Sequence, residues 1–391
     1  MPSSSSADRD LKEELDVSRW TRELSLDEIK AVCYKALNQA CTVSFYTQGT
    51  FNKLYLIVTA QGESSLLRVT LTAYPRSKTS GEVATLQWLR ANTGLPIPKV
   101  LAFQGSPTPK GFEWMIMERM PGKPLREAWR GLSMQQKVAL VERLAEFQAE
   151  LHASSHLRFP CIGTLQPGEP TPGRIVSHRF FMADHPRYKI PWGPFSSSRD
   201  WMDSQLQILI LSLDGAGGGA EETRACAKKL REVLPTVFPE KTDGGEAVIW
   251  HDDLSMANIL VDTQGEITAI IDWECVSALP LWVATRYPCF FTNTRAREEE
   301  PQRDENSPDN ELYWTQLMEY EVTQLRVAYD TRMDQLWPER KRMVEDKGVQ
   351  MQLEYYDAFL QLAGGTGLKE VEEWVEKIQG GELAGCNLND M

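Results

Sequence analysis

Residues 248–274, VIWHDDLSMANILVDTQGEITAIIDWE, carry polar side chains at a spacing suited to phosphoryl transfer. His251 and Asp253 precede Asn258, and a second acid, Asp272, comes fourteen residues after Asn258. Phosphoryl transfer needs oxygen ligands for magnesium and a carboxylate that faces the hydroxyl of the substrate. Asn258 and Asp272 are candidates for the ligands, and Asp253 is the candidate for the carboxylate. Their order along the chain therefore predicts this chemistry.

A β-hairpin is expected to bring the two ends of this segment together. Two apolar runs, at 259–261 and 267–271, flank the turn residues TQGE. A short turn between two such runs is typical of a hairpin, which would fold Asp272 back beside Asn258. A lone His-x-Asp would be read as ordinary turn and cap chemistry. Three oxygen-bearing side chains between apolar strands favour phosphoryl transfer instead.

The stretch resembles the catalytic loop and the metal-binding IDWE segment of the aminoglycoside phosphotransferase family, and more closely the fungal phosphotransferase-domain proteins of that family. The resemblance runs from about residue 40 to about residue 290. It implies an α+β, bilobal protein-kinase-like fold, with a small antiparallel-sheet N-lobe and a larger, mainly helical C-lobe. It also implies ATP and Mg2+ as cofactors and a small-molecule hydroxyl as the acceptor.

The expected domains follow from this likeness. A polar tail at 1–24 precedes the N-lobe at 25–120, and the C-lobe at 121–380 precedes a tail at 381–391. A chain of 391 residues is long enough for two lobes with their own cores.

Each residue of the motif has a separate expected task. Asp253 accepts or orients the proton of the acceptor hydroxyl, and Asn258 and Asp272 hold magnesium. His251, grouped with Asp253 as a catalytic residue, is expected to organise the loop by hydrogen bonding and packing rather than to move protons.

The first part of the N-lobe is expected to be a helix followed by strands. Residues 26–40 have an amphipathic pattern, and Ser25 with Glu28 predicts a capping box. The next segment alternates with a period of two, which predicts a three-stranded meander with turns near 48–52 and 61–64.

The first of these turns would lie over the nucleotide. Gly49 would let the backbone approach, and the amides of Thr50, Phe51 and Asn52 would face phosphate oxygens. One glycine in a hairpin is weak evidence, and a plain turn is the alternative.

A kinase also needs a cation on its third strand, oriented by an acid on the next helix. Arg68 and Glu82 are the candidates, although protein kinases have lysine at the strand position. Arginine offers a planar fork instead of a point charge. The simpler alternatives are a surface strand residue for Arg68 and a charge favoured by the helix dipole for Glu82.

A hinge is expected where FEWMIMERMPG ends in a Pro-Gly turn. By resemblance, Met117 is the gatekeeper, the carbonyl of Glu118 meets the adenine amino group, and the backbone of Met120 meets the ring nitrogen. The methionine side chains are equally consistent with ordinary core on an alternating strand.

The C-lobe is expected to be built on a long helix that starts near Ser133 and lies beneath the catalytic loop. His152 near its end is read as a cap or packing residue. An irregular stretch follows, and then come helices near 198–213 and 220–234. Helical segments near 312–335 and 338–378 close the chain, and in relatives such helices wall the acceptor pocket.

Two positions in the catalytic loop depart from the family. Asp252 stands where the family usually has glycine, and Ser255 where it often has histidine. The second change removes a cation near the transferred phosphate. Together with Arg68 it motivates an alternative, a nucleotide-binding pseudokinase that acts as a scaffold without turnover. A protein substrate is disfavoured because no Ala-Pro-Glu motif follows the loop.

Composition limits the partners. The net charge of −13 argues against a nucleic-acid partner. The sequence contains no run of eighteen apolar residues, so no membrane span is expected. The polar start of the chain is unlike a signal peptide, so a cytoplasmic location is expected. Seven cysteines are scattered without a Cys-x-x-Cys pair, so we expect reduced thiols. The oligomeric state is not indicated by any pattern.

Overall fold

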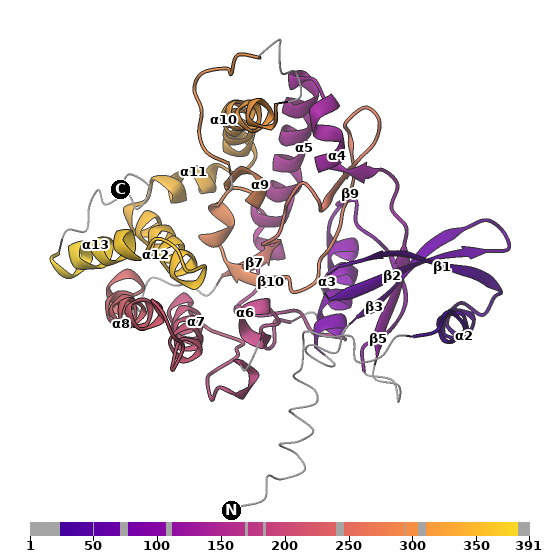
Figure 1. Ribbon diagram of the computed structural model, residues 1–391, viewed down its shortest axis with the longest axis horizontal. Helices are drawn as coiled ribbons and strands as arrows, with labels where there is room; N and C mark the ends of the chain where they lie inside the picture. Colours follow the sequence, from indigo (N-terminus) through magenta and orange to yellow (C-terminus); the bar gives the residue numbers. More distant parts are fainter. Residues whose placement is uncertain are drawn as a thin grey trace, which may run out of the picture.

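A five-stranded antiparallel sheet forms the N-terminal part of the protein (Figure 1). The computed structural model describes residues 24–49, 51–70, 77–106, 112–168, 171–182, 185–239, 246–292, 294–303 and 310–381. The sheet has the order β1-β2-β3-β5-β4, with the strands β1 Cys41–Gln48, β2 Asn52–Thr59, β3 Ser64–Thr70, β4 Val100–Gln104 and β5 Glu113–Glu118. The predicted three-stranded meander is confirmed as β1 to β3, because these strands pair in sequence and antiparallel.

One helix packs against each face of this sheet. The helix α2 Leu26–Leu37 begins with the predicted capping box, in which the Ser25 hydroxyl accepts from the Glu28 amide and the Glu28 carboxylate accepts from the Ser25 amide. Its apolar side packs on strand residues that include Leu67 and Val69. The helix α3 Lys78–Asn92 covers the other face. Since side chains alternate along a strand, Arg68 points toward α3.

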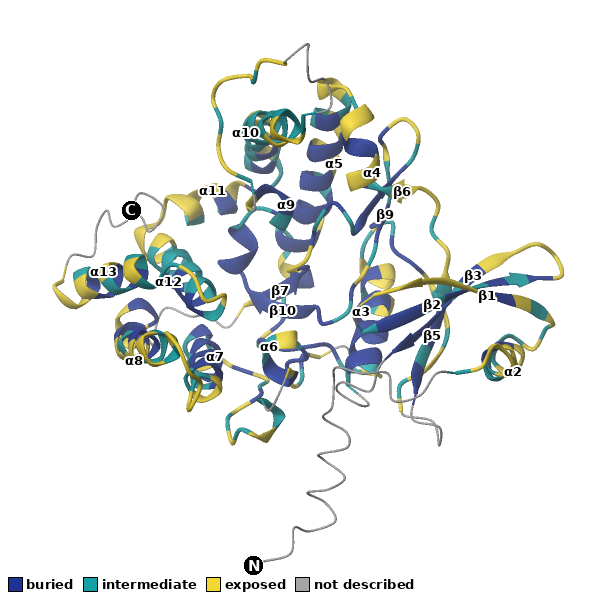
Figure 2. Ribbon diagram, in the orientation of Figure 1, coloured by how far each residue is buried: buried dark blue, intermediate teal, exposed yellow. Residues whose placement is uncertain are grey.

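The long helix α5 Met134–His152 is the centre of the C-terminal part (Figure 2), and most of its buried positions are apolar. Ser133 caps it, in a capping box with Gln136. The other helices of the described residues are α4 Leu125–Ala128, α6 His178–Phe181, α7 Ser198–Ser212, α8 Ala220–Val237, α9 Cys289–Thr292, α10 Glu311–Leu336, α11 Pro338–Glu345, α12 Lys347–Ala363 and α13 Leu368–Gln379. Single 3-10 turns are η1 Trp129–Gly131, η2 Ser155–Leu157, η3 His185–Arg187 and η4 Val283–Thr285.

Two small sheets frame the segment with the candidate chemistry. The strands β7 Ala247–Trp250 and β10 Ser277–Pro280 pair antiparallel. The predicted hairpin is present as β8 Ile259–Val261 and β9 Ile267–Ile270, joined at one edge by β6 Lys123–Pro124. The chain therefore leaves β7, runs through the loop and the hairpin, and returns to the same place at β10.

The last predicted helical segment, 338–378, consists of three separate helices. Pro338 starts α11, where a missing amide hydrogen has no cost. Asp346 caps α12 by accepting from the Val349 amide, and so begins a new helix immediately. Gly365 and Gly367 have positive φ angles of 72° and 62° and separate α12 from α13.

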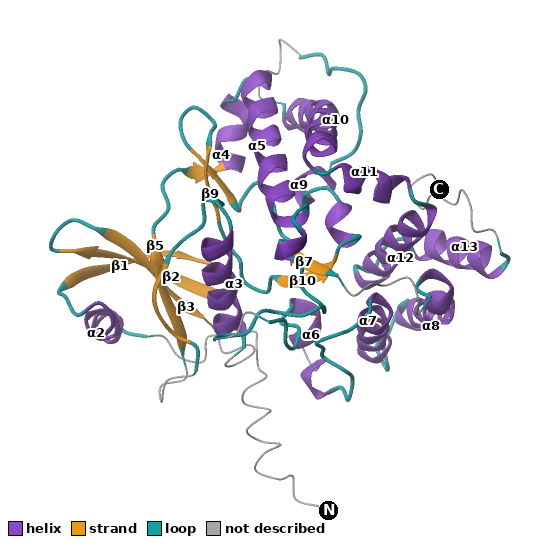
Figure 3. Cartoon of the chain, turned by 180° about the vertical axis from the view of Figure 1, so that it is seen from behind, coloured by secondary structure: helices purple, strands orange, loops and turns teal. Residues whose placement is uncertain are grey.

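The observed arrangement is the expected mixed fold. The five-stranded sheet lies on one side together with α2 and α3, and most of the other helices lie on the opposite side, as the view from behind shows (Figure 3). Among the described residues, no helix is long and apolar enough to cross a membrane. The six cysteines within the described ranges are all free thiols. The cellular location stays a prediction.

Candidate active site

Asn258 fixes the position of Asp253. The side-chain amide of Asn258 donates to the Asp253 backbone carbonyl at 2.8 Å and to Asp253 Oδ2 at 3.0 Å. A turn supports this contact, because the Ser255 amide donates to the Asp253 carbonyl and the Asn258 amide donates to the Ser255 carbonyl. Both hydrogens of the Asn258 amide thus face Asp253. The amide oxygen, on the opposite side of the planar group, remains for a cation.

Ile271, the residue before Asp272, is held by two residues of the loop. Its amide donates to the Asn258 carbonyl at 2.9 Å, and its carbonyl accepts from His251 Nε2 at 3.0 Å. His251 must therefore carry its proton on Nε2. Its ring also packs edge-on against Trp273, with centroids 4.8 Å apart. These bonds place Asp272 beside Asn258, as the hairpin predicted.

Asp272 has an unusual backbone conformation and a raised pKa. Its φ of 64° lies in the left-handed region, which a residue other than glycine seldom adopts. Burial raises its pKa, the neighbouring Glu274 raises it further, and Arg68 opposes the shift. The side chain is nevertheless 42% exposed. A divalent cation there would stabilise the charged form of this carboxylate.

The oxygens of Asn258 and Asp272 fit a magnesium ion that also binds nucleotide. Within the described residues, no three His, Cys, Asp or Glu side chains are grouped to hold a metal on their own. Magnesium, however, commonly uses one or two protein oxygens together with substrate phosphates and waters. A two-residue set is therefore adequate for this metal, and its role stays a proposal.

Arg68 and Glu82 form the ion pair that the sequence predicted. The Arg68 guanidinium contacts the Glu82 carboxylate, and both side chains are buried. Arg68 Nη1 also lies 3.8 Å from Asp272 Oδ1 and 3.7 Å from Glu274 Oε2. The alternative of a surface strand residue is wrong, because Arg68 is only 4% exposed.

Glu274 and Lys78 are charged residues that the sequence did not single out. Lys78 Nζ donates to Glu274 Oε2 at 2.7 Å, and the Asn52 side-chain amide donates to the same oxygen at 2.8 Å. Burial disfavours the Glu274 carboxylate, but Lys78 and Arg68 outweigh burial and lower its pKa to about 2. Lys78 itself is 1% exposed. Glu274 therefore ties the sheet and α3 to the segment that carries Asp272.

The turn between β1 and β2 reaches toward this cluster. The Phe51 ring stacks on His178 at 5.0 Å, and Lys78 Nζ lies 5.2 Å from the centre of the same ring. The Gly49 amide donates to the Asn52 carbonyl and closes the turn. A Cβ at Gly49 would meet no protein atom within 4 Å, so the protein itself does not require glycine there. Thr50 lies outside the described residues. The predicted phosphate contacts of these amides stay predictions.

The predicted hinge residues lie at the end of β5 and just after it. The Glu118 amide donates to the Lys99 carbonyl at 2.9 Å, and its carboxylate accepts from the Lys99 amide at 3.2 Å. Met117 is partly buried and packs against the large core, as an ordinary strand residue would. Met120 follows two residues after the strand. The backbone contacts predicted from Glu118 and Met120 to adenine stay predictions.

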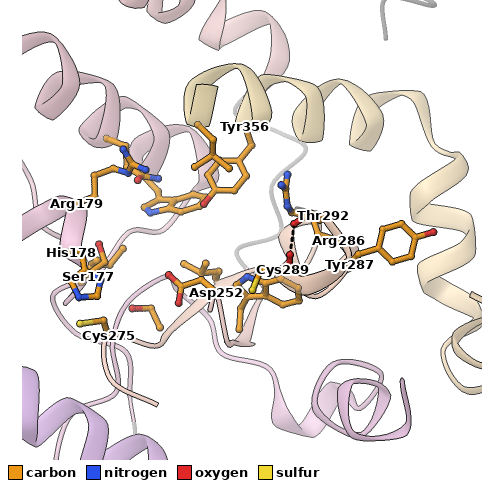
Figure 4. Close-up of a pocket in the computed structure, with 17 residues that line it drawn as sticks. Ser177, His178, Arg179, Asp252, Cys275, Arg286, Tyr287, Cys289, Thr292 and Tyr356 are labelled. Carbon is orange, nitrogen blue, oxygen red and sulfur yellow. Dashed lines mark hydrogen bonds between the residues drawn. The ribbon is translucent and has the colours of Figure 1, made fainter. Parts of the chain in front are cut away.

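A cavity of about 370 Å³ lies next to the catalytic loop. Asp252 lines it, and so does Cys289, whose thiol lies 3.8 Å from Asp253 Oδ1. Residues of α6, α7 and α12 complete its walls, including Arg179, Trp201 and Tyr356 (Figure 4). A molecule in this cavity would therefore be adjacent to Asp253.

Sequence comparison finds the family described as "APH: Phosphotransferase enzyme family" over residues 42–283. Clavilactone A biosynthesis cluster protein Y from Ampulloclitocybe clavipes is 26% identical, over 76% of this chain and 68% of that protein. A subtelomeric hrmA-associated cluster protein of Aspergillus fumigatus is 24% identical, over 62% of this chain and 59% of its own length. The chain thus spans only about three fifths of the Aspergillus protein.

Solved structures agree on the fold. A thermostable mutant of aminoglycoside phosphotransferase APH(4)-Ia, in complex with AMP-PNP and hygromycin B, matches with a TM-score of 0.52 and 15% identity. The match covers 89% of this chain and 95% of that one. The apo form matches with a TM-score of 0.51, over 88% and 95% of the two chains. At this identity the likeness concerns the fold alone.

Proposed function

Because this chain belongs to the phosphotransferase enzyme family, we propose that it is an ATP- and Mg2+-dependent kinase whose acceptor is a hydroxyl of a small molecule. The observation that carries the proposal is the convergence of Asp253, Asn258 and Asp272. Asn258 holds Asp253 through its side-chain amide and holds the residue before Asp272 through its backbone carbonyl.

In the proposed reaction Asp253 receives or orients the proton of the acceptor hydroxyl. The hydroxyl oxygen forms a bond to the γ-phosphorus while the bond from that phosphorus to the β–γ bridging oxygen breaks. The products are the phosphorylated acceptor, ADP and a proton. Asn258 and Asp272 would hold magnesium, which supplies neutralising charge for the phosphates. His251 keeps the loop in place.

The N-terminal part would bind the nucleotide. Arg68, oriented by Glu82, is the proposed cation for the phosphates, and its 3.8 Å approach to Asp272 supports this position. The amides of Phe51 and Asn52 would cover the phosphates, and Glu118 and Met120 would bind adenine through the backbone. A small-molecule acceptor is supported by the cavity beside Asp253 and by the relative named for a clavilactone A cluster.

Substitution of the two acids tests this proposal. Asp272→Ala should abolish magnesium-dependent binding of AMP-PNP, measured by calorimetry. Asp253→Asn should leave that binding intact and lower transfer of labelled γ-phosphate by about a hundredfold or more, the size expected for a lost catalytic base. The metal-binding acid and the proton-accepting acid therefore give different results.

Asp262→Asn is the matched control, since Asp262 lies in the same hairpin and accepts only backbone amides there. It should change neither binding nor transfer. Equal behaviour of the Asp253 and Asp272 variants in both assays would contradict the assignment of their roles.

The alternative is a nucleotide-binding scaffold, for which Ser255 is the motivating residue. Ser255 supports the loop through its backbone, and its short side chain brings no cation to the transferred phosphate. Magnesium-dependent nucleotide binding without ADP formation, over a wide panel of alcohols, would favour the scaffold over the kinase.

A further inference from the structure

Arg179 is a cation that faces the cavity and forms no ion pair within the part of the chain that the structure describes. Its guanidinium lies over the Phe359 ring, 4.7 Å from the ring centre. No carboxylate of the described residues lies within 4.0 Å of it. Burial lowers the pKa of Arg179, and Tyr356 and Asp252 nearby partly oppose this. An arginine keeps its charge in such surroundings, so the cavity contains a positive charge that has no ion-pair partner among the described residues.

The second arginine of the cavity differs in this respect. Arg286 Nη1 lies 2.5 Å from Asp357 Oδ1, so its charge is already balanced within the protein. Its guanidinium also lies over the Tyr356 ring, at 5.3 Å. Only Arg179 of the two is therefore available to a bound anion.

The one carboxylate among the lining residues, Asp252, lies at the reacting end. Figure 4 shows Arg179 and Tyr356 on the upper side of the pocket, with Asp252 and Cys289 below them. Cys289 contacts Asp253, so this lower end adjoins the proposed base. Burial raises the pKa of Asp252, and Asp253 adds to the shift while His251 opposes it. Asp252 therefore lies at the end of the cavity opposite Arg179.

Aromatic side chains limit the shape of the occupant. Trp201 and Tyr356 pack against each other with centroids 5.6 Å apart, and Trp250 lines the same space. A volume of about 370 Å³ is near the lower end of the range for small-molecule sites. These features favour a small ring compound over a large polycationic sugar.

We propose that the acceptor of this enzyme is a small hydroxylated carboxylic acid, and that Arg179 binds its carboxylate. The planar fork of arginine matches a carboxylate in two parallel hydrogen bonds. With the acid held at Arg179, the hydroxyl at the other end of the molecule points toward Asp253. This inference rests on the proposed function, since only a kinase makes the occupant of the cavity an acceptor.

Three para-substituted benzyl alcohols, with an anionic, a neutral and a cationic substituent, test the proposal. They are para-(hydroxymethyl)benzoate, the corresponding amide, and para-(hydroxymethyl)benzylamine, titrated into the full chain with AMP-PNP and magnesium and followed by calorimetry. The acid should bind best. Arg179→Gln should weaken binding of the acid by about tenfold to a hundredfold, the worth of a charge-assisted hydrogen-bonded contact. It should leave binding of the amide unchanged.

Arg174→Gln is the matched control. Arg174 also stacks on an aromatic ring, with its guanidinium 4.7 Å from the centre of Trp192, but it does not line the cavity. This variant should bind the acid like the original chain. The ligand series on the unchanged protein does not depend on any variant folding.

Preferential binding of the amine, equal binding of all three, or no binding of the acid at millimolar concentration would overturn the inference. Phosphate transfer is measured alongside with ATP. Arg179-dependent binding of the acid without transfer to any compound would contradict the kinase and leave the carboxylate site standing. Phosphate transfer to the amide or the amine that Arg179→Gln does not change would support the kinase and contradict the carboxylate site.

Discussion

The contacts of the His251 side chain indicate that it positions other residues of the loop. It holds the Ile271 carbonyl through Nε2 and so fixes the residue before Asp272. We predict that His251→Gln, whose side-chain amide can donate the same bond, keeps kcat within about tenfold. His251→Phe should lose considerably more, because the buried carbonyl is left without its donor.

The dependence of kcat on pH distinguishes this role from proton transfer. The profile of His251→Gln should keep the shape of the original. Loss of one limb of the profile in that variant would show that His251 moves a proton. The measurement is steady-state ADP release on any acceptor that the enzyme accepts.

At the residue scale, the sequence was informative where a local motif carried the candidate site. The spacing of Asn258 and Asp272 sufficed to predict that a hairpin folds the end of this segment back, as the bond from the Ile271 amide to the Asn258 carbonyl shows. Lys78 and Glu274 are 196 positions apart, and no local pattern connects them. Arg179 was missed for the same reason, since its surroundings come from α12, far along the chain.

The clamp made by Glu274 acts at the scale of elements. Through Asn52, Arg68 and Lys78 it joins β2, β3 and α3 to the segment after β9. Glu274→Gln would leave the buried ammonium of Lys78 without its counter-charge. Breaking one partner of a buried ion pair costs about 3–5 kcal/mol. We therefore predict a loss of this order in the free energy of unfolding, measured by urea denaturation, together with weaker AMP-PNP binding.

Glu311→Gln is the control, because Glu311 and Arg130 form an exposed ion pair. Such pairs contribute less than about 1 kcal/mol. If the two variants lost similar stability, the Glu274 clamp would have no special role in joining β2, β3 and α3 to the segment after β9.

The elements themselves were largely predictable. Alternation identified β1 to β3, and Ser25 and Ser133 marked the starts of α2 and α5 through capping boxes. The segment 338–378 was harder, because its apolar spacing continues across the breaks. Only Pro338, Asp346 and the two glycines near 366 reveal three helices, and their effect depends on backbone angles that a periodic pattern does not contain.

At the scale of the whole molecule, charge is distributed unevenly. The chain carries a net charge of −13, yet the cavity beside the catalytic loop contains Arg179, which stacks on Phe359 and has no ion pair with any described residue. Net charge is therefore a poor guide to the acceptor, because it averages over surfaces that the acceptor never meets. The proposed carboxylate acceptor depends instead on the local surroundings of Arg179.

Buried histidine makes the stability of the whole protein depend on pH. His152, at the end of α5, is buried against Trp250 and Trp337, and its Nε2 bonds to the Ile249 carbonyl. Burial lowers its pKa from 6.5 to about 4, an effect that the Ile249 bond only partly opposes. The unfolded chain therefore takes up a proton more readily than the folded one. The stability that this group contributes is complete above pH 6.5 and is lost as pH falls toward 4.

We predict that His152→Gln removes much of this acid sensitivity, because glutamine can donate to the Ile249 carbonyl and does not titrate. Between neutral pH and pH 4, the free energy of unfolding should fall by up to about 3 kcal/mol less in the variant than in the original chain. Urea denaturation at a series of pH values measures the difference. His156→Gln, a change at an exposed histidine on the turn after α5, should leave the dependence as it was. Identical pH dependence in the His152 variant and the original chain would mean that other groups cause the acid sensitivity, and the packing of α5 against β7 would then have no part in it.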